Sequence, residues 1–235
     1  MDIDPKGVNG PPLPLVRARL RTPRAAAVAG IAFSGLLTCS LVLLQLYVPS
    51  NPLEEGAWLA TSARRVTFAL NLIPFAGIAF LWFIGVLRDR LGDQEDKFFA
   101  TVFLGSGLLF LGMVFITASM AGGLILAHSV QPTALLESGA FTFARAFMFN
   151  VMHIYAFRMA AVFMISASTL AIRTCITARW IALVGYIAAL FLLFGSSQFD
   201  WVLLVFPAWV LLVSLYILID NLRGASGAVS AEHKG

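Results

Sequence analysis

The chain has 235 residues, of which 60% are hydrophobic and only 12% are charged. An average soluble domain is about 45–50% apolar and about 25% charged, so the composition excludes an ordinary soluble globule. The charge distribution excludes it more firmly, because Asp, Glu, Lys and Arg are absent from residues 25–53, 66–87, 98–136, 180–199 and 201–219. Apolar stretches of about 18 residues or more are typical of membrane-spanning helices.

The sequence therefore predicts an all-α polytopic membrane protein, with six transmembrane helices in a bundle formed by residues 25–222. The predicted spans are residues 25–48, 66–87, 98–127, 145–172, 180–195 and 201–219. A basic segment of residues 1–24 precedes the bundle and is expected to be disordered, and a flexible tail of residues 223–235 follows it. Residues 128–144 are expected to form a loop, and Pro74 is expected to kink the second span.

The basic residues set the expected topology. Most of the 16 Lys and Arg residues lie on the side of both termini if all six spans cross the membrane. The positive-inside rule identifies that side as cytoplasmic. The first apolar stretch is longer than the roughly 7–15 residues of a signal peptide, so we expect an uncleaved span. The abundance of Arg, Ala and Gly is typical of a GC-rich bacterial genome, which predicts a multi-pass protein of the bacterial plasma membrane.

The first span carries small residues at intervals of four, namely Ala26, Gly30, Ser34 and Thr38. This spacing places them on one helix face, where small side chains allow a second helix to approach closely. We interpret them as a helix-packing face, used either against another helix of the same bundle or in a homo-oligomer.

Arg158 is the most distinctive candidate site residue, because it lies at the middle of the fourth predicted span. A charge in the membrane normally faces the bundle interior and has a partner, yet no Asp or Glu lies deep in any span. At about 100° per residue, Asn150, His153 and Arg158 share a broad face, while Met152, Met159 and Phe163 lie opposite and are expected to face lipid. Asn71, one turn before Pro74, is expected to contribute at a similar depth.

These residues predict a polar lane that binds an anionic or amphiphilic ligand. The other interpretation is structural, with Arg158 satisfied by backbone carbonyls or by Asp200. We expect no cofactor and no metal site, because two widely separated cysteines and three histidines offer no ligand spacing. Sequence motifs of hydrolases, zinc proteases and nucleotide-binding enzymes are absent, so an enzyme is not expected, and nothing indicates nucleic-acid binding.

One short segment, Gly85 to Gly92, resembles the front of the Gly-x-x-x-Asp-Arg-x-Gly motif of major facilitator transporters. Asp93 and Gln94 then replace the basic residues with which that motif continues, so no membership is inferred. Two hypotheses about function remain. The first is a small transporter or channel-like protein with a ligand at the Arg158 lane. The second is a non-catalytic accessory or scaffolding subunit of a larger membrane complex.

Overall fold

The computed structural model describes residues 22–49, 51, 56–91, 97–174, 178–195 and 200–232. All regular secondary structure in these residues is helical. The elements are α1 (Thr22–Tyr47), α2 (Ala57–Thr61), α3 (Ala63–Leu91), α4 (Lys97–Val130), α5 (Pro132–Glu137), α6 (Gly139–Asn150), the π-helix η2 (Val151–Ala156), α7 (Phe157–Thr174), α8 (Arg179–Gly195), the 3-10 helix η3 (Asp200–Leu204) and α9 (Val205–Glu232).

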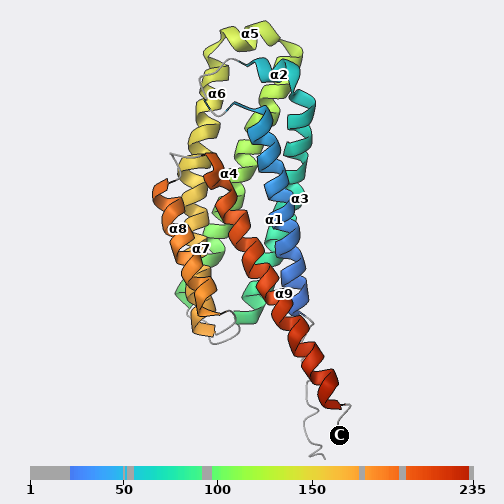
Figure 1. The fold of residues 1–235 in the computed structure, drawn as a ribbon. Coiled ribbons are helices and arrows are strands. Elements are labelled where there is room, and N and C mark those ends of the chain that lie inside the picture. The colour runs from blue at the N-terminus through green and yellow to red at the C-terminus, as the bar shows by residue number, and fades with distance from the viewer. Residues whose placement is uncertain are drawn as a thin grey trace, which may run out of the picture.

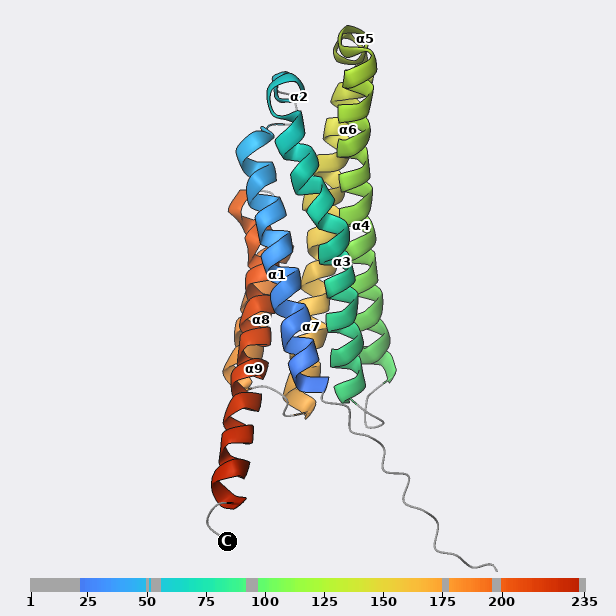
Figure 2. The same cartoon turned by 90° about the vertical axis from the view of Figure 1, so that its right-hand side faces the viewer.

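The long helices run side by side along one axis, and the two ends of this bundle differ (Figures 1 and 2). The short helices α2 and α5 cover one end, which we call the far end. The start of α1 and the end of α9 lie at the other, which we call the terminal end. α8 stops well short of the far end (Figure 1). The half of the bundle nearer the far end, the far half, is therefore built mainly from α1, α3, α4 and α6.

Five helical segments are long and apolar enough to cross a membrane: residues 25–47, 63–88, 100–130, 139–173 and 201–223. The chain is thus an integral membrane protein with several apolar helices. The fifth predicted span corresponds to α8, a shorter apolar helix of 17 residues. Residues 1–21, which include most of the predicted N-terminal segment, and Cys175 lie outside the described residues.

Several predicted boundaries are wrong, because Pro and Gly interrupt helices more briefly than expected. The predicted loop of residues 128–144 is mostly helical, since α4 continues to Val130 and Pro132 occupies the first turn of α5. Proline is tolerated at that position because the first turn needs no amide donor. Pro74 lies within α3, as in the predicted span, and only the end of the helix differs, because α3 runs on to Leu91. α9 likewise continues to Glu232, into the predicted flexible tail.

A layer of buried phenylalanines closes the middle of the bundle. Phe80 of α3 is fully buried, and its ring contacts one ring from each of α1, α4, α7 and α9. The centroid distances range from 4.5 Å to Phe33 to 5.8 Å to Phe110 and Phe206. Edge-to-face and tilted ring pairs of this kind add to the packing of five helices. This aromatic layer separates the terminal half of the bundle from the far half.

Candidate functional site

Arg158 lies on a long helix that no loop interrupts. α6, η2 and α7 follow one another without a break, and residues 151–156 form a π-helix. Two side chains, those of His153 and Arg158, each place a nitrogen atom near the backbone carbonyl oxygen four residues earlier in the sequence. Nδ1 of His153 lies 3.2 Å from the carbonyl oxygen of Phe149, and Nη1 of Arg158 donates to the carbonyl of Ile154 at 2.7 Å. A π-helix shifts the backbone pairing from i→i+4 to i→i+5, and such segments are frequent at functional sites.

Arg158 does not face the interior of the bundle, so that part of the sequence interpretation is wrong. Its side chain is exposed on α7. Its depth follows from the pairing of α7 with α8, in which the hydroxyls of Thr169 and Tyr186 are 2.7 Å apart. Arg158 precedes Thr169 by 11 residues. Because α8 runs back alongside α7, the same number of residues counted from Tyr186 along α8 reaches just past Gly195, where α8 ends. Arg158 thus lies level with that end and points its guanidinium further toward the far end.

The structure does not bring the four predicted ligand residues together. Asn150 is exposed on α6 and Asn71 is exposed on α3, whereas His153 is half-buried. His153 lines a hollow beside α1, and Asn71 lines a different one beside α4. Asp200 begins η3, but its side chain is outside the part of the chain that the structure describes. The predicted residues therefore do not line one continuous lane.

The predicted lipid-facing side of this helix is also wrong. Phe163 is fully buried and stacks on Phe103 with a centroid distance of 4.6 Å, while Met159 and Met152 are half-buried. The interior of a membrane bundle is as apolar as the lipid around it, so apolar character does not identify the outward face. The π-helix also changes the angle per residue between Asn150 and Phe157, which a constant 100° cannot reproduce.

The small residues of α1 are used within the chain. Ala26, Gly30 and Ser34 are buried, and Thr38 is half-buried. A Cβ on Gly30 would collide with Oγ of Ser214 in α9 and lie 2.9 Å from the ring of Phe83 in α3. This face of α1 therefore lies against α9 and α3.

The far half contains a small apolar hollow, which we call the chamber. It has a volume of about 100 Å³ and lies among α1, α3, α4 and α6–η2. Aliphatic side chains make most of its wall, together with Thr117, whose hydroxyl donates to the carbonyl of Met113 at 2.9 Å. Trp58 of α2 also lines the chamber and is 4% exposed. Its Nε1 has no hydrogen-bond partner among the described residues, which is unusual for a buried polar group.

A second hollow of about 150 Å³, which we call the mouth, adjoins the chamber between α1 and α6–η2. The two share a wall of six side chains: Leu41, Leu44, Val48, Thr117, Met148 and Met152. The mouth adds polar groups to this wall, namely Gln45, Arg145 and His153, and Leu203 of η3 also lines it. An apolar hollow thus adjoins a second hollow that has polar residues in its lining.

Arg145 is the functional candidate that the sequence analysis missed. It is only 6% exposed, and its Nη2 donates to the carbonyl of Pro49 at 2.6 Å and lies 3.4 Å from that of Asn51. Its guanidinium also lies 5.9 Å from the centroid of the Trp58 ring. The fourth predicted span begins at this residue, directly after the predicted loop of residues 128–144. The surrounding sequence FTFARAFMF is an apolar helical run, and this signal indicates a buried arginine rather than a flanking one.

The chamber and the mouth are lined mainly by apolar side chains. Among the described residues, no group of three or more His, Cys, Asp or Glu side chains could hold a metal ion. The chamber presents apolar surface, and the lining of the mouth includes a guanidinium, an amide and an imidazole. No family model, curated protein or solved structure matches the chain.

Proposed function

We propose that this membrane protein binds a single-chain amphiphile, with its chain in the chamber and its head group at the mouth. The observation that carries the proposal is the adjoining pair of hollows, apolar inside and polar at the rim. Their volumes, about 100 and about 150 Å³, are small beside the roughly 300–1,000 Å³ of pockets for drug-sized ligands. This size favours one short chain over a two-chain lipid, since a cavity of about 150 Å³ holds a molecule as small as benzene. The guanidinium of Arg145 favours an anionic or hydrogen-bond-accepting head group.

The aromatic layer favours a binding protein or carrier over an open channel. Phe80 and its four ring partners fill the centre of the bundle just on the terminal side of the chamber. A polar solute would have to displace several packed rings to pass along the axis. Access to the chamber from the side requires no such rearrangement.

We further propose that α8 completes a set of six spans and that the N- and C-termini of the chain are both cytoplasmic. α8 has 17 residues, or about 25 Å at 1.5 Å per residue, against about 30 Å of hydrocarbon. Bilayers adapt to short helices by thinning. The exposed Arg88, Arg173, Arg179 and Arg223 lie toward the terminal end, as the positive-inside rule requires of a cytoplasmic side. The chamber then lies in the outer half of a plasma membrane, which we take to be bacterial.

The test is photolabelling in nanodiscs with a single-chain fatty acid that carries a diazirine. We expect labelled peptides from α4 and α6 in the wild-type protein. Ala121 is 3% exposed and lines the chamber, so Ala121→Leu fills it and should remove this labelling. Ala127 is exposed on the same helix, and Ala127→Leu is the matched control that should label like wild type. Equal labelling of the two variants would contradict the proposal.

A second candidate function is an accessory or scaffolding subunit, which the surroundings of Arg158 favour. The guanidinium binds the carbonyl of Ile154 in its own helix, so the residue needs no ligand to be tolerated. Crosslinking in native membranes followed by mass spectrometry tests this function. Links to another membrane protein, combined with no fatty-acid labelling of the chamber, would establish the second candidate over the first.

A further inference from the structure

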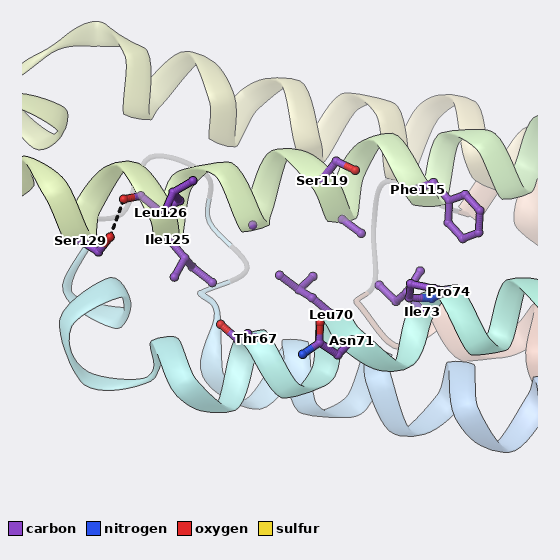
Figure 3. Close-up of a pocket in the computed structure, with 12 residues that line it drawn as sticks. Thr67, Leu70, Asn71, Ile73, Pro74, Phe115, Ser119, Ile125, Leu126 and Ser129 are labelled. Atoms are coloured by element: carbon purple, nitrogen blue, oxygen red, sulfur yellow. Dashed lines mark hydrogen bonds between the residues drawn. The ribbon is translucent and has the colours of Figure 1, made fainter.

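A third hollow lies on the side of the chamber away from the mouth. This groove, of about 590 Å³, runs between α3 and α4 in the far half (Figure 3). It shares Leu70, Ile73 and Ala118 with the wall of the chamber. These three side chains therefore stand between the groove on one side and the chamber on the other.

We propose that the groove is a second opening of the chamber, and that Leu70 and Ile73 form the gate between them. The inference rests on the proposed function, and it adds a path: a single-chain amphiphile enters at the mouth, crosses the far half sideways and leaves through the groove, or moves in reverse. The protein then moves its ligand laterally through the bundle and not along the bundle axis.

The groove exists because α3 and α4 are in close contact on only one side of Pro74. Toward the terminal end, Gly77 meets the ring of Phe115, and Gly107 meets Ile84. Toward the far end, α4 presents Gly122, where an added Cβ would meet nothing within 4 Å. Figure 3 shows α3 and α4 on opposite sides of this space, with the side chains of Leu70 and Ile125 between them.

The gate is one side chain thick and belongs to a weakened segment of helix. Proline has no amide hydrogen, so Pro74 leaves the carbonyl of Leu70 without its usual helical donor. Missing backbone bonds of this kind are where transmembrane helices bend. Leu70 is only half-buried, so a rotamer change or a small movement of residues 63–73 opens the wall. Ala118 on the opposite helix adds little bulk.

The groove also has the composition that an amphiphile requires. Ile73, Ile125 and Leu126 supply apolar surface, and Thr67, Asn71 and Ser119 supply polar groups along it (Figure 3). The amide of Asn71 is exposed and makes no hydrogen bond with any described residue. An amide at this depth is costly unless it finds a polar partner, and a head group that travels along the groove provides one.

The test measures how fast a dansyl-labelled single-chain fatty acid binds to the protein in nanodiscs. The fluorescence of this probe rises in an apolar site. Gln45→Trp obstructs the mouth, and Ser119→Trp obstructs the groove. Both residues lie outside the buried core, so the variants should fold. We expect each single variant to bind the probe more slowly, and the double variant to lose binding.

The gate is tested in the mouth-obstructed protein. Leu70→Ala should raise its association rate severalfold, whereas Leu81→Ala, a change of the same size at an exposed position of α3, should not. If Gln45→Trp alone abolished binding and Ser119→Trp had no effect, the chamber would have one entrance and the second opening would be excluded, while the proposed function would stand. If wild-type protein showed no saturable binding, the proposed function itself would fail.

Discussion

The contact between α1 and α9 at Gly30 gives the sharpest test of how the small-residue face of α1 is used. Gly30→Ala adds one methyl group, which would collide with Oγ of Ser214 and lie 2.9 Å from Cδ2 of Phe83. Gly35 on the same helix is the matched control, because a Cβ there meets nothing within 4 Å. Both changes give the same gain in helix propensity, so their difference isolates the steric cost.

The expected difference in the free energy of unfolding between Gly30→Ala and Gly35→Ala is about 1–3 kcal/mol, the usual cost of overpacking a core. Ser214 supplies the nearest atom, and its hydroxyl is already bonded to the carbonyl of Val210 in its own helix at 2.7 Å. Ser214→Ala alone should therefore have a small effect. Combined with Gly30→Ala it should recover more than half of the lost stability.

The assay is reversible unfolding in mixed detergent micelles. Wild type, Gly30→Ala, Ser214→Ala and the double variant form a double-mutant cycle. The measurements are repeated over a range of protein concentrations. A loss of stability that depends on concentration would show that this face is a homo-oligomer interface. If Gly30→Ala were as stable as Gly35→Ala, or if Ser214→Ala gave no rescue, the packing argument for α1 and α9 would be refuted.

Three further substitutions test the roles of single side chains. Arg145→Gln removes the charged donor and its contact with Trp58 and should lower the free energy of unfolding by about 2–3 kcal/mol, measured in the same micelles. Ser168→Ala removes a buried hydroxyl without a partner among the described residues, so stability should stay constant or rise. Arg158→Gln should change stability by less than about 0.5 kcal/mol and leave fatty-acid labelling unchanged; lost labelling would return Arg158 to the site.

Helices were predictable from this sequence, but the directions in which they face were not. Charge-free apolar stretches identify membrane helices because a charge in hydrocarbon is costly, and all five long helices lie at predicted spans. The same argument fails inside the bundle, because a membrane protein has no apolar-to-polar gradient from core to lipid. Phe163 was therefore assigned to lipid and is fully buried.

The two arginines of the long helix show a second limit of sequence reasoning. Arg158 attracted attention because it is far from both ends of a predicted span, but its side chain is exposed. Arg145 was assigned to the end of that span, and it is buried against α2 and the carbonyl of Pro49. The helix begins at Gly139, earlier than predicted, and this changes the position of every polar residue along it. The π-helix adds a rotation for which the sequence carries no clear signal.

The position of η3 helps to explain why the proposed openings lie at the sides of the bundle and not on its axis. In the middle of the bundle, rings from α1, α3, α4, α7 and α9 meet at Phe80, and this aromatic layer closes the axis. α9 packs against α1 only on the terminal side of η3, and Leu203 of η3 lines the mouth beside α1. On the opposite side, α4 presents small residues such as Gly122 beyond the level of Pro74, and no side chain of theirs fills the space between α3 and α4. The mouth thus lies where η3 ends beside α1, the groove lies beside Pro74, and both are lateral to the axis that the aromatic layer closes.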